Sequence, residues 1–222
     1  VLCEKQAGRL KQPALVICPT SLVANWRAEA ARFAPALKTL VLHGVDRHDH
    51  YDQLKKCDLA ITTYPLLPRD AEQLKKQGFH LLILDEAQTI KNPKAKASEV
   101  VRELKAAHRL CLTGTPMENH LGELWSLMDF LMPGLLGDAE QFRRAYRNPI
   151  EQDGDSARQA ALSQRLAPFM LRRRKQDVLA ELPAKTEIVR TIALTGKQRD
   201  LYESVRLSVQ DSLRQAIAAN GL

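Results

Sequence analysis

Short apolar runs that alternate with amphipathic stretches are the feature of this sequence that most restricts its fold. Near-continuous apolar strands separated by helices are typical of a parallel sheet that helices cover on both faces. The predicted buried strands are Ala14 to Cys18, Leu37 to Leu42, Leu59 to Thr62, Phe79 to Leu84 and Arg109 to Leu112. The helical patterns between them are about Leu22 to Phe33, Asp49 to Lys56, Arg69 to Lys76 and Ala97 to Lys105. The sequence therefore predicts an α/β fold, whose functional groups gather where the strands end.

From about residue 121 this alternation gives way to successive helices. The predicted helices are Leu121 to Met132, Ala139 to Tyr146 and Ser156 to Ala167, with a turn-rich stretch from Asn148 to Asp155. A strand-like segment, Glu187 to Leu194, and a long helical pattern, Lys197 to Ala219, follow. We therefore expect an α/β core over residues 1–120, a helical insertion over 121–185, and a strand and helix over 186–222 that lead toward a following domain.

Composition limits the classes of function. The 222 residues carry a formal net charge of +7, which suits an anionic partner such as nucleic acid, although many ordinary proteins share it. No apolar run approaches the roughly 18 residues of a membrane helix, so no membrane partner is expected. The 4 cysteines show no CxxC pairing, which favours core thiols in a reducing compartment. We expect a cytoplasmic protein.

An acidic pair ends one of the predicted strands. The run FHLLILDE, residues 79–86, is apolar until Asp85 and Glu86. Two carboxylates at the exit of a buried strand suit nucleotide hydrolysis, since one can hold Mg²⁺ through water while the other activates the attacking water. For these eight residues alone, however, a strand that ends in solvated acids is the commoner explanation.

Small hydroxyl residues follow two other strands. Pro19-Thr20-Ser21 comes after the first strand, and Leu112-Thr113-Gly114-Thr115-Pro116 ends the fifth. Hydroxyl groups and backbone N–H groups at the start of a loop or helix are well placed to hold phosphate oxygens. The acidic pair is therefore accompanied by hydroxyl residues at other strand ends, which a chance pair would lack.

These segments belong to an ordered set that resembles a known family. The set is LVICPTSLVANW (15–26), DLAITTY (58–64), LDEAQTIKNP (84–93), LTGTPMEN (112–119), and MLRRRKQDV (170–178) with LPAK (182–185). It resembles motifs Ia, Ib, II and III and a later block in the first RecA-like lobe of the Swi/Snf family, within the superfamily-two helicases. Several motifs in a fixed order are highly specific. The DEAQ-x-IKNP motif resembles the bacterial branch of the family more than the eukaryotic remodellers.

The resemblance implies a role for each matching residue. Asp85 would be the Mg²⁺ partner and Glu86 the catalytic base. Gln88 would sense the γ-phosphate of ATP and link it to motif III, whose Thr113, Gly114 and Thr115 would transmit the nucleotide state. DNA phosphates would be contacted by Thr20, Ser21, Thr62 and Thr63. In the family the block around Arg172 and Arg173 lies near the seam between lobes, so phosphate or partner-lobe contact is expected there.

Some residues stay open at this point. The basic run 172–175 is also compatible with a solvated charged face, the commoner origin of such runs. Trp26 and Trp125 are assigned to core packing, which is the usual place of tryptophan. Lys91 and Asn92 are undecided between loop structure and function.

The sequence departs from the family in one respect. The phosphate loop G-x-x-x-x-G-K-[ST] is absent; its nearest approach, Gly196-Lys197, is followed by Gln198 and lacks the first glycine. We therefore expect ATP and Mg²⁺ to be cofactors of a longer parent protein. We expect neither to bind tightly to this chain, and the chain alone to be inactive.

Two functions of different class follow. The first is a fragment of an ATP-dependent double-stranded-DNA translocase, a DNA-dependent ATPase with DNA and a second RecA-like lobe as partners and a nucleoid-associated location. The second is a non-catalytic module that binds nucleic acid or a partner. The complete Asp85-Glu86 pair favours the first, since a binding module needs neither carboxylate. A DEAD-box RNA helicase lobe is disfavoured by the IKNP extension and the helical insertion.

Overall fold

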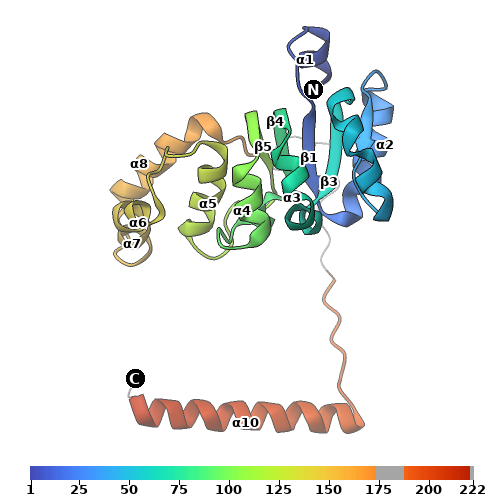
Figure 1. Ribbon diagram of the computed structural model, residues 1–222. Helices are drawn as coiled ribbons and strands as arrows, with labels where there is room; N and C mark the ends of the chain where they lie inside the picture. The colour runs from blue at the N-terminus through green and yellow to red at the C-terminus, as the bar shows by residue number, and fades with distance from the viewer. Residues whose placement is uncertain (174–187, 221–222) are drawn as a thin grey trace. The chain divides into compact units, whose positions relative to one another are not determined.

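The computed structural model describes residues 1–173 and 188–220 of the chain. The chain divides into two compact units, Val1–Met170 and Leu171–Leu222. The first unit contains a sheet of five strands in the order β2-β3-β1-β4-β5 (Figure 1). The strands are β1 Ala14–Cys18, β2 Thr39–Val41, β3 Leu59–Thr63, β4 Gly78–Asp85 and β5 Lys105–Leu112. All neighbouring strands are parallel, as predicted.

Helices cover both faces of the sheet, which confirms the predicted α/β architecture. They are α2 Val23–Phe33, α3 Leu67–Lys75, α4 Lys96–Glu103 and α5 Leu121–Leu131, and a short helix, α1 Leu2–Gln6, precedes β1. On one face the apolar side chains of α3, α4 and α5 join those of the sheet in a single cluster. On the other face α2 packs against a second cluster. Every residue of β1 is fully buried, because this central strand is covered on both sides.

The helical part continues the same compact unit. It comprises α6 Ala139–Phe142, a π-helical turn Arg143–Arg147, α7 Asn148–Glu151 and α8 Ser156–Leu166. Its apolar cluster includes Leu124 and Met128 of α5, whereas Leu127 and Phe130 of the same helix join the sheet cluster. Helix α5 therefore ties the helical part to the sheet. The division into a core over residues 1–120 and a helical insertion over 121–185 remains a prediction.

Two predicted elements within this unit are wrong in kind. The segment predicted as a helix from Asp49 to Lys56 lies in a 3-10 helix, Val45–Lys56. Leu54 is its only buried residue, so it lacks the apolar stripe that would hold an amphipathic α-helix against the core. The predicted turn from Asn148 to Asp155 begins instead with α7, where Pro149 occupies the first turn and is tolerated.

Short 3-10 turns link several of these elements. They are Thr20–Leu22, Tyr64–Leu66, Ala87–Ile90 and Ala167–Phe169. No helix in the two described ranges is long and apolar enough to cross a membrane.

The cysteines are all free: Cys18 is buried and Cys3 exposed, which makes the expectation of core thiols wrong for Cys3. Burial raises the pKa of Cys18 to about 11, so that thiol is protonated and inert at neutral pH.

The second unit contains α10, Gly196–Asn220, which confirms the helix predicted from Lys197. The strand predicted from Glu187 to Leu194 is wrong over its described residues, 188–194, which form neither strand nor helix. Ile188 and Val189 are exposed there. An apolar run forms a strand only where a neighbour accepts its backbone hydrogen bonds, and the described part of this unit contains no strand. Residues 174–187, with the LPAK segment, lie outside the described residues.

Candidate active site at the carboxyl edge of the sheet

The candidate site lies where the parallel strands end. Asp85 is the last residue of β4 and pairs with Leu112, the last residue of β5. Thr20 follows β1 by two residues, Thr62 lies at the end of β3, and Thr113 follows β5 directly. Because the strands share one direction, these residues lie at one edge of the sheet, as predicted.

Three donors from different elements hold Asp85. The backbone N–H of Glu86 donates to Oδ1 at 3.0 Å, and the indole N–H of Trp26 on α2 donates to Oδ2 at 2.7 Å. The hydroxyl of Tyr64 donates to the backbone carbonyl of Asp85 at 2.7 Å. Burial raises the pKa of Tyr64, so it stays protonated and remains a donor. Asp85 is therefore fixed in both its backbone and its carboxylate.

The contact of Trp26 is a finding that the sequence did not indicate. Its ring packs against the α2-side cluster, which confirms core packing, but its N–H reaches a residue 59 positions away. Trp125 donates its own indole N–H to the carbonyl of Gly137 at 3.0 Å, in the helical part. The two tryptophans thus look alike in sequence and differ in what their polar atom contacts.

Glu86 has an unusual backbone conformation. Its φ of 50° makes it the only non-glycine residue with positive φ among the described residues. Such a conformation costs on the order of 1–3 kcal/mol and persists only where the surroundings enforce it. Here the N–H and hydroxyl of Thr89 both donate to the Glu86 carbonyl, at 3.0 and 2.8 Å. These two hydrogen bonds hold the backbone of Glu86 in place.

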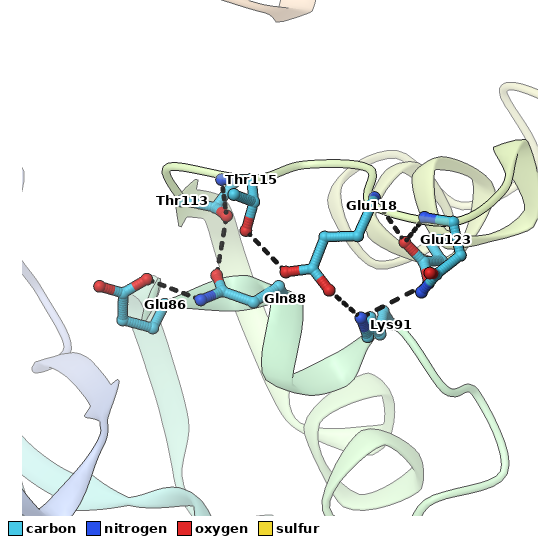
Figure 2. Close-up of polar contacts among 8 residues, drawn as sticks. Glu86, Gln88, Lys91, Thr113, Thr115, Glu118 and Glu123 are labelled. Atoms are coloured by element: carbon cyan, nitrogen blue, oxygen red, sulfur yellow. Dashed lines mark hydrogen bonds and ion pairs between the residues drawn. The ribbon is translucent and has the colours of Figure 1, made fainter. Parts of the chain in front are cut away.

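A hydrogen-bonded chain joins Glu86 to the loop after β5 (Figure 2). The Gln88 amide donates to Glu86 Oε2 at 2.8 Å and accepts from the Thr113 hydroxyl at 2.8 Å. The backbone N–H of Thr115 in turn donates to the Thr113 hydroxyl at 3.1 Å. Gly114 lies between the two threonines, with open space around it. The contact between Gln88 and the motif III segment is present as expected; its role in signalling remains a prediction.

Lys91 extends this chain on its other side (Figure 2). Its ammonium group forms an ion pair with Glu118 and lies 3.5 Å from Glu123 Oε1. Glu118 also accepts from the Thr115 hydroxyl at 3.1 Å. Lys91, undecided from the sequence, therefore bridges the DEAQ segment and the segment that follows β5. Asn92 accepts the backbone N–H of Lys94 at 3.0 Å, which is a contact of loop structure.

Glu123 is a buried carboxylate that organises the segment after Thr115. It accepts the backbone N–H groups of Glu118 and Asn119 at 2.8 and 3.2 Å, and the side-chain amide of Asn119 at 2.8 Å. Burial alone would raise its pKa, but these hydrogen bonds and the charge of Lys91 outweigh burial and lower the pKa to about 2. The ionised form is thus the one that the fold requires.

This lowered pKa predicts acid sensitivity. A carboxylate whose folded pKa lies below its ordinary value of 4.5 stabilises the protein above that value and loses the contribution as the pH falls toward 2. Glu123→Gln should therefore lower the free energy of unfolding at neutral pH, and its gap to the unmodified chain should narrow between about pH 4.5 and 2. Urea unfolding at a series of pH values measures this gap. A gap that stays constant would show that Glu123 is not ionised in the fold.

The four hydroxyl residues expected to contact DNA differ in accessibility. Thr20 and Ser21 are exposed at the start of the segment that leads into α2. Thr62 and Thr63 are each 1% exposed, and the Thr62 hydroxyl donates to the backbone carbonyl of Leu42 at 3.3 Å. Thr62 and Thr63 therefore present no exposed side chain at the end of β3, and their contact with DNA phosphates remains a prediction. Sequence reasoning located the strand end but not its burial.

Arg172 and Arg173 are exposed, and both belong to the second unit. The described residues give neither arginine an ion-pair partner, so a solvated face and a phosphate contact are both compatible with what is seen. Their assignment to DNA or to a partner lobe remains a prediction.

The residues at the sheet edge fit a magnesium ion held through water. Each oxygen of Asp85 accepts one hydrogen bond and keeps a second lone pair for a water or an ion. Within the described ranges no group of three or more His, Cys, Asp or Glu side chains could hold a metal, so water and phosphate oxygens would complete the shell. The phosphate loop is missing from the sequence. These 222 residues therefore contain an acidic pair at the sheet edge and no G-x-x-x-x-G-K-[ST] motif.

Comparisons with known proteins agree with this geometry. Residues 2–220 match the family model of the SNF2-related domain. The putative ATP-dependent helicase/translocase YwqA of Bacillus subtilis is 40% identical over 98% of this chain, which spans 24% of that protein. The TATA-binding protein-associated factor MOT1 of Saccharomyces cerevisiae is 39% identical over 86% of this chain, which spans 11% of it.

A solved structure is similar as well. The Sulfolobus solfataricus SWI2/SNF2 ATPase core in complex with double-stranded DNA superposes with a TM-score of 0.73 and 42% identity. The match covers 80% of this chain and 37% of that one. It confirms the predicted RecA-like α/β fold. The family match covers nearly the whole sequence, and the chain therefore belongs to the SNF2-related domain family.

Proposed function

We propose that this chain is the part of an ATP-dependent double-stranded-DNA translocase that carries the catalytic carboxylates. The observation that supports this most is the continuous contact from Glu86 through Gln88 to Thr113 at the carboxyl edge of the sheet. A module that only binds DNA needs neither an acidic pair nor a link between the pair and a neighbouring loop. The name of the similar Sulfolobus structure, with its bound duplex, also supports DNA as the partner.

Each site residue then has a chemical task. Bound Mg²⁺ would neutralise charge on the phosphates of ATP. Asp85 would hold the water shell of the ion, and Glu86 would accept the proton of the attacking water. Gln88, hydrogen-bonded to both Glu86 and Thr113, would report the position of the γ-phosphate to the loop of Thr113, Gly114 and Thr115.

The remaining parts of such an enzyme would be a phosphate loop and a second RecA-like lobe. ATP and Mg²⁺ would be its cofactors, and the cytoplasmic nucleoid its place of work. The alternative is a non-catalytic module that binds nucleic acid or a partner. The acidic pair and its network favour the enzyme.

Phosphate release with and without duplex DNA tests the proposal. The chain alone should hydrolyse no ATP, because no loop holds the β- and γ-phosphates. A protein that carries this chain together with a G-x-x-x-x-G-K-[ST] loop and a second lobe should hydrolyse ATP, and duplex should stimulate it. If that protein bound duplex but hydrolysed no ATP, the binding-module function would be correct.

Duplex binding by the chain alone should be weak and independent of sequence. Thr20 and Ser21 are short and exposed, so they reach phosphates rather than bases. Each phosphate neutralised by a surface lysine or arginine adds a slope of about −0.9 in log K against log[salt]; with roughly two to four such phosphates, Kd should lie near 10⁻⁴–10⁻⁶ M. Anisotropy titrations on two unrelated duplexes at several salt concentrations measure this.

A control places the contact on the sheet. Replacing both Thr20 and Ser21 with Ala should weaken binding, whereas Thr39→Ala should not, since Thr39 is exposed at the start of β2, at the opposite edge. Affinity that ignores salt, or that differs tenfold between duplexes, would contradict a phosphate-contacting site.

A further inference from the structure

Helix α2 carries both an expected DNA contact and a contact with the catalytic edge. The exposed Thr20 and Ser21 form a 3-10 turn, Thr20–Leu22, that runs directly into α2 at Val23. One turn further along, Trp26 points its indole N–H at the Asp85 carboxylate. A displacement of the start of α2 would therefore carry the indole with it, because the turn and the helix are continuous.

The hydrogen bond of Trp26 is the part of the Asp85 environment that comes from α2. The other donor to the carboxylate is the backbone N–H of the next residue, Glu86, and Tyr64 holds only the backbone carbonyl. A donor to an ionised carboxylate forms a short and strong hydrogen bond, here 2.7 Å from Nε1 to Oδ2. Without it, Oδ2 loses the one side-chain donor that the structure assigns to it.

The ring of Trp26 is also well anchored. It packs with Val23 and Ala30 of α2 against buried residues of β1 and β3. A rigid aromatic ring transmits the position of its helix to its N–H group with little freedom of its own. Packing and hydrogen bonding together make this side chain a mechanical link between α2 and β4.

We propose that Trp26 is a positioning residue that orients the Asp85 carboxylate toward its magnesium water shell and links that orientation to DNA contact at the start of α2. This proposal rests on the proposed function, because only that function places Mg²⁺ at Asp85. Groups that hydrogen-bond a metal-ligating carboxylate fix its orientation, and their loss typically costs about 10–100-fold in metal affinity or activity. The hydrogen bond from Trp26 to Asp85 would thus connect the DNA contact at the start of α2 to the nucleotide site.

The first test needs only the chain itself and no activity. The sequence contains 2 tryptophans, so a ¹H–¹⁵N spectrum shows two indole signals, which Trp125→Phe assigns. Asp85→Ala leaves Trp26 in place and removes its acceptor; the Trp26 indole proton should move upfield while the Trp125 signal stays. Trp125 is a matched reference, since its N–H donates to the backbone carbonyl of Gly137 and not to Asp85. An unmoved Trp26 signal would overturn the contact and the proposal with it.

The second test uses the ATP-hydrolysing protein that carries this chain. Trp26→Phe keeps an aromatic ring in the cluster and removes the donor. The Mg²⁺ concentration for half-maximal DNA-stimulated turnover should rise about 10–100-fold, and Trp125→Phe should leave it unchanged. An unchanged Mg²⁺ dependence in a folded Trp26→Phe protein would refute the positioning role, whatever the loss in turnover.

Failure of the proposed function gives a different pattern. If the unmodified protein hydrolyses no ATP, the translocase proposal fails, and the role of Trp26 at a magnesium site fails with it, even where the spectra confirm its hydrogen bond. If the unmodified protein is active and Trp26→Phe matches it at every Mg²⁺ concentration, the translocase proposal stands and only the inference about Trp26 is lost.

Discussion

If the proposed function holds, Glu86→Gln is expected to lower ATP turnover of a protein that carries this chain with a phosphate loop and a second lobe by about 10²–10⁴-fold, the range of a lost general base. Glutamine keeps the size of the side chain, and its amide oxygen can still accept the hydrogen bond that Gln88 donates to Glu86. What it cannot do is take the proton of the attacking water. Nucleotide binding should therefore persist, because none of the proposed binding groups is removed.

Steady-state phosphate release with duplex, together with nucleotide titration, measures both quantities. Glu29→Gln, on the exposed surface of α2, is the matched control and should leave turnover unchanged. Wild-type turnover in Glu86→Gln would mean that Glu86 is a solvated acid at the end of a strand. The unusual φ of Glu86 would then have to be explained by loop structure alone.

Arg47→Met is expected to destabilise the fold by about 3–5 kcal/mol, the cost of leaving a buried charge without its partner. Arg47 donates from Nε and Nη2 to the two oxygens of Asp70, at 2.8 and 3.0 Å. The Asp70 side chain is fully buried, and that of Arg47 is 11% exposed. The pair joins the 3-10 segment Val45–Lys56 to α3, so its loss should release that segment from α3.

Urea unfolding of the chain measures this difference in free energy. Arg143→Met is the matched control: Arg143 pairs with Glu140 on α6, but both side chains are 54% exposed. Exposed pairs contribute about 0–1 kcal/mol because water and salt screen them. Equal losses in the two variants would show that the Arg47–Asp70 pair is not the buried contact described.

The sequence by itself determined the strands and the edge of the sheet at which the site lies. Strands that are buried on both faces are largely apolar, so β1 stands out as an uninterrupted apolar run and β3 and β4 as runs that are mostly apolar. Parallel strands share one direction, so residues that follow them must meet at one edge. The apolar runs therefore place Asp85, Glu86 and Thr113 at one edge, whereas the folded sheet decides that β4 and β5 are neighbours.

Only the tertiary structure decided which side chains contact one another at that edge. Trp26 reaches Asp85 across 59 residues, and Lys91 reaches Glu118 across 27. No local pattern pairs such residues, because the pairing depends on how helices are seated on the sheet. The tertiary structure also decided burial. Threonine is a polar residue that is mostly exposed in proteins, yet Thr62 is buried because β3 packs between its neighbours. The sequence gives the type of each side chain, whereas its accessibility and its contacts arise only when distant segments pack together.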